Sequence, residues 1–220
     1  MDEITVMLVE DHLLVRQGTR DLLDKEPDLR VVAEAGDGIE AVQLAQEHQP
    51  DVILMDISLP RMNGLEATRR IKGICPTTAV LVLTAYDDEE YVIAFLKVGA
   101  AGYLMKDVSV QDLVVAVRAV HAGETVLHPA VAAKAVHRVA QEVVVIPKAE
   151  SVESMQPTGL QLEILRMASQ WMTNQEIARM LSISSYEVRA NLNQLFQQLG
   201  VGSRIEAVLY ALRKGWLPRR

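Results

Sequence analysis

The sequence predicts an α/β fold, a doubly wound five-stranded parallel sheet, followed by a small all-α domain of four helices. Three observations support this division. Apolar runs alternate with segments of helical period over residues 1–122, and a series of helix-start signals fills the last part of the chain. In addition, residues 1–128 hold 11 Lys and Arg against 22 Asp and Glu, whereas residues 155–220 hold 8 against 4. An acidic first part and a basic last part indicate two domains with different partners.

Five apolar segments account for the predicted strands. They are Ile4–Val9, Arg30–Ala35, Asp51–Asp56, Ala79–Thr84 and Ala101–Leu104. The third is the clearest, because an unbroken apolar run bounded by prolines is typical of a strand that is buried on both faces. The segments between the strands have helical period, as a parallel sheet with helical crossovers requires. The helix after the fifth strand is predicted to begin at Ser109, with Asp112 completing its cap.

Polar residues follow four of these strands. Glu10 and Asp11 follow the first strand, Asp56 ends the third, Thr84 ends the fourth and Lys106 follows the fifth. Open α/β sheets place their ligands at the carboxyl edge, where these strand ends meet. The sequence therefore predicts a site with three carboxylates, one hydroxyl and one ammonium.

Composition limits the class of protein. A chain of 220 residues suits two modest domains or one large one, and a hydrophobic content of 50% indicates a folded protein. The single cysteine, Cys75, excludes a disulfide framework and suits a reducing compartment. The sequence shows no signal-peptide pattern and no apolar run near the roughly 20 residues that span a bilayer. We therefore expect a cytoplasmic protein with no membrane partner.

Two chemistries that such a sheet supports fit this sequence poorly. The glycine spacing of Gly36–Ala41 matches a dinucleotide-binding turn, but Asp37 and Glu40 would place negative charge beside a pyrophosphate. A phosphatase with an aspartyl nucleophile needs a second aspartate two residues after the first, and Ser58 occupies that place after Asp56.

The third chemistry is a phosphoacceptor aspartate, and the strand-end residues fit it. A carboxylate such as Asp56 is already a nucleophile and needs no general base. The oxygen ligands of Glu10, Asp11 and Asp56 suit Mg²⁺. Lys106 and the Thr84 hydroxyl can neutralise and bond the phosphoryl oxygens. We accordingly expect a protein that accepts a phosphoryl group and is not an enzyme.

The motifs that carry these residues are specific. They are Glu10-Asp11 after the first strand, DVILMDISLP, LTAYD and GAAGYLMK. With them, residues 1–122 resemble the receiver domain of two-component response regulators, which has a flavodoxin-like fold. The domain is expected to extend over residues 1–125.

The resemblance implies roles for single residues. It implies that Asp56 is phosphorylated by a partner histidine kinase, and that Thr84 and Tyr103 shift together as a switch when this happens. It also implies a Mg²⁺ site formed by Glu10, Asp11, Asp56 and the backbone carbonyl of Ser58.

Residues 126–153 are expected to form a linker. Val131–Val139 has helical composition, whereas Pro147 and the polar residues after it interrupt the pattern. The prediction is a tether that contains one short helix.

The last domain, residues 154–220, shows four helix-start signals. They are Thr158 with Gln161, Thr173 with Glu176, Ser184 with Glu187 and Ser203 with Glu206, each the pattern of a capping box. The short turn Leu181–Ser184 between the second and third helices predicts a helix-turn-helix. With the motifs NQEIARMLSIS and LGVGSRIEAVLYALRKG, residues 154–217 resemble the output domain of NarL/FixJ (LuxR-type) regulators.

That resemblance implies DNA binding in the major groove through the third helix, and dimerisation through the fourth. A homodimer is expected to form on phosphorylation. The base contacts of the family map onto Arg189, Ala190 and Asn193, and Arg can read guanine while Asn reads adenine. Arg179 and Arg204 lie off the third helix and are candidates for contacts to the DNA backbone.

The third helix departs from the family pattern, which is usually rich in Lys and Arg. Residues 185–199 hold one basic residue, Arg189. Two hypotheses therefore remain open. One is a transcription factor that phosphorylation controls. The other is a receiver-controlled interaction or dimerisation module with a degenerate helix-turn-helix that binds DNA weakly or not at all.

Overall fold

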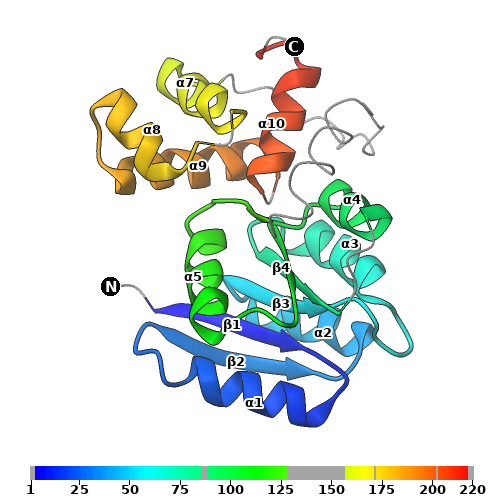
Figure 1. Cartoon of the computed structure of the whole chain (residues 1–220). Helices are drawn as coiled ribbons and strands as arrows, with labels where there is room; N and C mark the ends of the chain where they lie inside the picture. Colours follow the sequence, from blue (N-terminus) through cyan, green and yellow to red (C-terminus); the bar gives the residue numbers. More distant parts are fainter. Residues whose placement is uncertain (1–2, 86–88, 128–156, 171, 202, 218–220) are drawn as a thin grey trace.

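The computed structural model describes residues 3–85, 89–127, 157–170, 172–201 and 203–217. These residues form an N-terminal domain around a sheet and a helical C-terminal domain that lies beside α4 and α5 of the first (Figure 1). The helix predicted in the linker, at Val131–Val139, lies outside the described residues. None of the helices in the described ranges is both long and apolar enough to cross a membrane.

The sheet is entirely parallel. Its strands are β1 (Ile4–Val9), β2 (Leu29–Ala35), β3 (Val52–Asp56), β4 (Ala79–Thr84), β5 (Gly102–Met105) and β6 (Val126–Leu127), in the order β2-β1-β3-β4-β5-β6. The chain moves outward from β1 in one direction to β2, and in the other through β3 to β6. The doubly wound parallel sheet predicted from the apolar runs is thus confirmed.

The predicted number of strands is wrong, because the sheet has a sixth strand. Val126 and Leu127 pair with Gly102 and Tyr103 of β5. A strand of two residues is too short to show the alternation or the apolar run on which sequence prediction relies. The sheet therefore continues past residue 125, where the first domain was expected to end.

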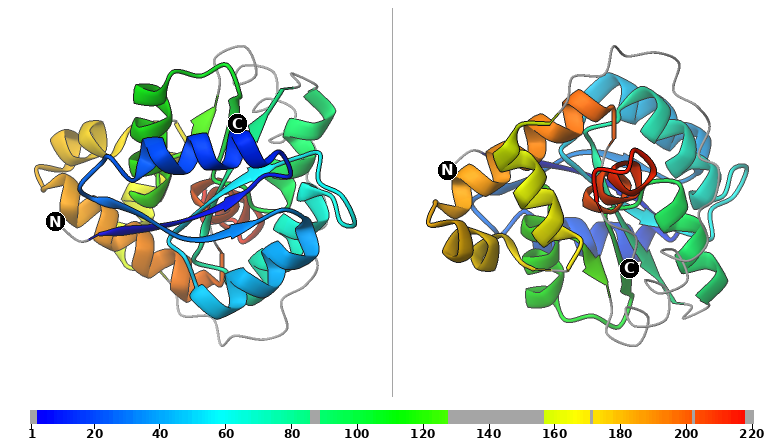
Figure 2. Two further views of the ribbon diagram at one scale, coloured as in Figure 1. Left: turned by 90° about the horizontal axis from the view of Figure 1, so that it is seen from below. Right: turned by 90° about the horizontal axis from the view of Figure 1, so that it is seen from above.

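Helices cover both faces of the sheet. They are α1 (Leu13–Leu23), α2 (Gly38–His48), α3 (Gly64–Ile74), α4 (Glu89–Lys97) and α5 (Val110–His121). Alternate residues of β1 point to opposite faces, so that Val6 and Leu8 pack with α1 and α5 while Met7 and Val9 pack with α2 and α3. Figure 2 shows these two layers on either side of the strands.

The C-terminal domain consists of α7 (Gly159–Ala168), α8 (Asn174–Leu181), α9 (Ser185–Leu199) and α10 (Arg204–Arg213), around an apolar core of its own. Three of the four predicted capping boxes are reciprocal, with Thr158, Thr173 and Ser184 as caps. At the fourth helix Ser203 accepts a hydrogen bond from the N–H of Glu206 at 3.2 Å. Each cap satisfies an N–H group that the helix itself leaves without a partner.

A cluster of charged side chains ties α5 to the turn before β2. Arg118 donates to both carboxylate oxygens of Asp28, at 2.8 and 2.6 Å, and to Glu26 at 2.7 Å. The hydrogen bonds from Arg118 lower the pKa of Asp28 from its ordinary value of 3.8. This ion pair joins elements that are far apart in the sequence.

We expect Arg118→Gln to lower the free energy of unfolding near neutral pH by less than about 1 kcal/mol, because the pair is partly exposed. A lowered carboxyl pKa stabilises the fold above the pKa of the unfolded chain, and this stabilisation is lost as the pH falls through the folded value. The difference between wild type and variant should therefore shrink in acid. Urea unfolding at several pH values measures it. Arg166→Gln, which removes a pair within α7, is the control, and a difference that persists in acid would contradict the assignment.

Candidate functional site

The carboxyl ends of four neighbouring strands bring the predicted site residues together. In the order β1-β3-β4-β5, the strand ends present Glu10, Asp56, Thr84 and Lys106 at one edge. The backbone N–H of Lys106 donates to the carbonyl of Thr84 at 2.7 Å, which fixes the end of β5 beside that of β4. The edge predicted from the sequence is therefore present in the structure.

Asp56 is positioned by a strand that is buried along its whole length. The residue is itself only 6% exposed, and its Oδ1 atom accepts a hydrogen bond from the N–H of Ile57 at 2.7 Å. The start of α3 passes against the same point, because a Cβ atom at Gly64 would overlap the carbonyl oxygen of Asp56. Only glycine permits this close approach, and it holds the loop after β3 next to the carboxylate.

Lys106 joins two of the three carboxylates. Its Nζ atom donates to Glu10 Oε2 at 2.7 Å and to Asp56 Oδ2 at 2.9 Å. Burial lowers the pKa of Lys106, but the hydrogen bonds and charges of Glu10 and Asp56 outweigh this effect and raise the pKa above its usual value. The side chain of Lys106 therefore stays an ammonium ion at neutral pH. This single cation holds the carboxylates of Glu10 and Asp56 close to each other.

The chemistry of the donor set fits a divalent cation. Glu10, Asp11 and His12 have ligand atoms that all lie within 4.8 Å of one another. Carboxylate oxygens are the ligands that Mg²⁺ prefers, whereas imidazole suits transition metals. Ser58, whose carbonyl was predicted to complete the site, lies on the exposed loop after β3. Glu10, Asp11 and Asp56 are thus the residues best suited to hold Mg²⁺.

His12 is a neighbour that the sequence did not single out. Its Nδ1 atom lies 2.8 Å from Asp11 Oδ1 and 3.2 Å from Glu10 Oε1. The charge of Asp11, followed by the hydrogen bond to Glu10, raises the pKa of His12. In the sequence, only its position directly after Glu10 and Asp11 could have indicated that His12 lies at this site.

The two predicted switch residues are buried. Thr84 and Tyr103 are both 0% exposed. The Tyr103 ring contacts Phe95 edge-on, with 6.4 Å between the ring centroids and 65° between the planes. Because β6 pairs beyond β5, Tyr103 lies inside the sheet and not at its edge, and any movement of its ring requires the surrounding apolar side chains to rearrange.

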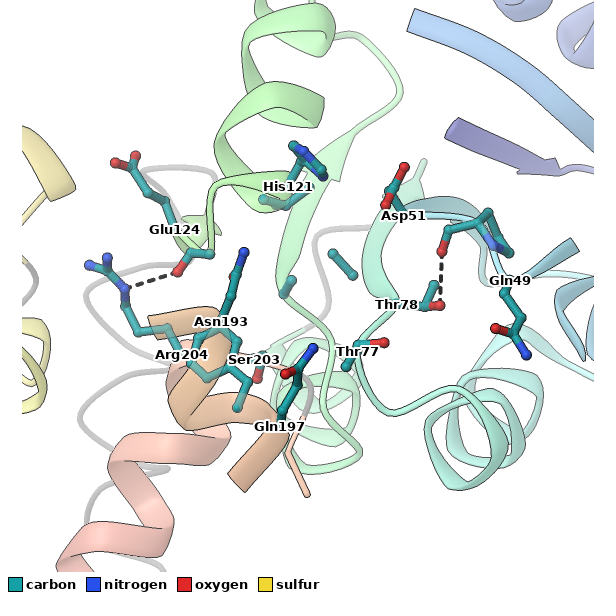
Figure 3. Close-up of a pocket in the computed structure, with 16 residues that line it drawn as sticks. Gln49, Asp51, Thr77, Thr78, His121, Glu124, Asn193, Gln197, Ser203 and Arg204 are labelled. Carbon is teal, nitrogen blue, oxygen red and sulfur yellow. Dashed lines mark hydrogen bonds between the residues drawn. The ribbon is translucent and has the colours of Figure 1, made fainter. Parts of the chain in front are cut away.

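Two of the residues predicted to read DNA, Arg189 and Asn193, lie on the side of α9 that faces the N-terminal domain. A side chain of that domain, His121 at the end of α5, is in hydrogen-bonding contact with Arg189. Asn193 borders a cavity of about 240 Å³ between the domains, together with His121 (Figure 3). Ala190 and, on α8, Arg179 are exposed.

Arg204, a predicted candidate for contact with the DNA backbone, is buried between the two domains. The residue is 5% exposed and donates to the carbonyls of Gly123 at 3.1 Å and Met172 at 2.7 Å, and also to Asn174. A contact with DNA would require Arg204 to leave these partners. The sequence could not show this, because its acceptors are distant in the chain and two of them are backbone atoms.

Two family models match the chain. The response regulator receiver domain matches residues 6–118, and the luxR family of bacterial regulatory proteins matches residues 158–211.

Similar proteins of known sequence match nearly the whole chain. An uncharacterized transcriptional regulatory protein, YxjL of Bacillus subtilis, is 36% identical over 97% of this chain and 97% of its own length. The oxygen regulatory protein NreC of Staphylococcus carnosus is 36% identical over 95% of this chain and 97% of its own. Among solved structures, the response regulator ChrA of a heme-sensing two-component system has a TM-score of 0.52 at 33% identity, over 98% of this chain and 100% of its own.

A phosphoacceptor-type site on a doubly wound sheet, followed by a helix-turn-helix, defines a response regulator with a DNA-binding output domain. This chain belongs to the response regulators that join a receiver domain to a LuxR-type helix-turn-helix, a family whose members regulate transcription.

We expect Lys106→Met to lower the melting temperature in the absence of metal, because Glu10 and Asp56 lose the cation that they share. Hydrogen bonds to charged groups contribute about 1.5–3 kcal/mol each. Added Mg²⁺ should then stabilise the variant more than the wild type, since the metal no longer competes with an ammonium ion. Thermal melts with and without Mg²⁺ measure both effects, with the exposed Lys25→Met as control. An equal or smaller Mg²⁺ effect in the variant would show that the lysine and the metal do not share this site.

Proposed function

We propose that Asp56 accepts a phosphoryl group from a histidine kinase, and that phosphorylation controls dimerisation and sequence-specific DNA binding. The observation that carries this proposal is the position of Lys106, within 2.9 Å of Asp56 and 2.7 Å of Glu10 at the carboxyl edge of the sheet. At this edge the carboxylate of Asp56 provides the acceptor, and the ammonium ion of Lys106 provides a counter-charge for the incoming phosphoryl oxygens.

Each residue has a distinct part in the proposed transfer. Asp56 attacks phosphorus with a carboxylate oxygen while the bond from phosphorus to the histidine nitrogen of the kinase breaks, and the N–H of Ile57 keeps the carboxylate oriented. Lys106 exchanges a carboxylate partner for a phosphoryl oxygen, and the hydroxyl of Thr84 donates to another. Mg²⁺ held by Glu10, Asp11, Asp56 and the carbonyl of Ser58 would supply further positive charge at the same oxygens.

The arrangement of the domains supports control of DNA binding. Arg189 contacts His121, and Asn193 borders the cavity on the other domain. A recognition helix enters the major groove with the residues at positions like those of Arg189 and Asn193 facing the bases. In this structure the N-terminal domain covers that side of α9 and obstructs its entry into the groove. We infer that phosphorylation separates the domains and that a homodimer then binds DNA.

Asp56→Asn should abolish phosphorylation, because an amide lacks the nucleophilic carboxylate. Intact-mass measurement after treatment with acetyl phosphate should show one added phosphoryl group in the wild type with Mg²⁺. No adduct is expected in the variant or in excess chelator. Asp112→Asn, at the exposed start of α5, is the control and should retain the adduct. Labelling of Asp56→Asn would assign the acceptor elsewhere.

In the phosphorylated chain, Arg189→Ala should weaken binding to the preferred duplex by about 1–3 kcal/mol and affect a scrambled duplex much less. A base contact discriminates between sequences, whereas a phosphate contact does not. The duplex is first selected from a random pool, and affinities are then measured over a range of salt concentrations. Arg166→Ala on α7 serves as the control.

Because α9 has few basic residues, we also consider a second function, that of an interaction or dimerisation module. Equal affinity of the phosphorylated wild type for both duplexes at every salt concentration would favour an interaction or dimerisation module over a transcription factor.

A further inference from the structure

A strained residue lies in the loop between β3 and α3, shortly after Asp56. Among the described residues other than glycine, three have a positive φ. Gln49 and Ser182 are the C-caps of α2 and α8, where a left-handed conformation is common. Arg61, with a φ of +62°, lies at no helix end. Such a conformation is costly for a residue that has a Cβ atom, and it persists only where the surrounding structure imposes it.

The chain also turns tightly at Arg61. The backbone N–H of Met62 donates to the carbonyl of Pro60 at 2.6 Å, across Arg61. A hydrogen bond between residues two apart, around a positive φ, is typical of the rare and strained form of γ-turn. Strain of this kind is concentrated at functional sites, so its position in the loop after the acceptor aspartate is informative.

The rest of this loop is folded back onto the acceptor strand. The N–H groups of Leu59 and Gly64 both donate to the carbonyl of Ile57, at 3.2 and 3.0 Å. Ser58 lies inside the loop that these bonds close. The direction of its carbonyl therefore depends on the conformation of the whole loop, including the strained turn.

An ion pair holds the strained residue. The guanidinium of Arg61 pairs with Oδ2 of Asp37, in the turn between β2 and α2. Oδ1 of Asp37 accepts hydrogen bonds from the N–H groups of Ile39 at 2.8 Å and Glu40 at 3.0 Å, which cap α2. The Asp37 side chain is 8% exposed, against 60% for Arg61. The carboxylate is thus fixed by its own helix, and it anchors the more mobile guanidinium.

A close contact next to the ion pair joins the same two segments. A Cβ atom at Gly38 would overlap the carbonyl oxygen of Met62, so only glycine allows this approach. Adjacent residues therefore touch in both segments, Asp37 with Arg61 and Gly38 with Met62. The glycine spacing of Gly36–Ala41, which matches a dinucleotide-binding turn in the sequence, here makes room for the loop after β3.

We propose that Arg61 is a positioning residue for the metal site, and that its ion pair with Asp37 fixes the loop that carries the carbonyl of Ser58. The inference rests on the function proposed above, in which this carbonyl completes the Mg²⁺ site. Mg²⁺ demands nearly ideal octahedral geometry, so a ligand on a loosened loop binds it less well. Neither Arg61 nor Asp37 touches the metal in this role, because both act through the backbone of the loop.

The charge of Arg61 makes positioning distinguishable from electrostatics. By electrostatics alone, removal of a positive charge near a metal site strengthens binding of a cation, and removal of a negative charge weakens it. Loss of a positioning contact weakens binding in both cases, because either change frees the loop. The two explanations therefore predict opposite signs for Arg61→Ala.

The test is isothermal titration of Mg²⁺ into the full chain without a phosphoryl donor. Arg61→Ala and Asp37→Asn should each weaken Mg²⁺ binding about tenfold, the low end for residues that orient a metal ligand. Asn still caps α2, so Asp37→Asn removes only the charge. The double variant should also lose only about tenfold, because the two residues act as one unit. Arg61→Gln serves in place of Arg61→Ala if the latter fails to fold.

Two matched variants are the controls. Arg61→Lys keeps the positive charge and should bind Mg²⁺ as the wild type does. Arg69→Ala removes an exposed ion pair with Glu66 on α3 and should leave Mg²⁺ binding unchanged. At saturating Mg²⁺, acetyl phosphate should label Asp56 in Arg61→Ala at the wild-type rate, because the contacts of Asp56 with Lys106 and Ile57 remain.

The outcomes separate the positioning role from the function on which it rests. A folded Arg61→Ala variant with unchanged or tighter Mg²⁺ binding overturns the role of Arg61, and leaves Asp56 as acceptor if the wild type binds Mg²⁺ and is labelled. A double variant whose loss is the product of the two single losses also overturns it. A wild type that binds no Mg²⁺ overturns the proposed metal site together with this inference.

Discussion

The shared ammonium ion of Lys106 is the interaction on which the arrangement of the N-terminal domain depends. Glu10 and Asp56 are separated from it by 96 and 50 residues in the chain, and their carboxylates would repel each other without it. Meeting at one point requires β1, β3, β4 and β5 to be neighbours in a single parallel sheet. The apolar core packs against both faces of the strands below this edge. The charged cluster of Glu10, Asp56 and Lys106 is therefore held at the end of a closely packed sheet.

Features that depend on neighbouring residues were predictable from the sequence. The apolar run of β3 identifies a buried strand without knowledge of its partners, and Ser184 with Glu187 marks the start of α9 because the cap and its partner are three residues apart. The carboxyl-edge site could be predicted as well. Parallel strands must end on the same side, so residues that follow them in sequence converge in space.

Features that depend on distant partners could not be predicted. The strand β6 exists because β5 offers it hydrogen bonds, and its two residues carry no pattern of their own. Arg204 looks like a solvated cation in the sequence, yet the structure buries it against carbonyl groups of both domains. The full burial of Tyr103 likewise results from β6, α4 and Ile205, three elements that the local sequence around it does not reveal.

The capping residues of the C-terminal domain have an evolutionary consequence. Thr158, Thr173, Ser184 and Ser203 each accept a hydrogen bond from an N–H group of their own helix, and the main apolar core of this domain is separate from that of the sheet, with Ile205 as the residue that packs against the N-terminal domain. Much of what specifies these four helices is therefore carried within this part of the chain. Recombination can transfer such a unit to another sensory partner intact, and only the few residues at the junction then need to be adjusted by mutation.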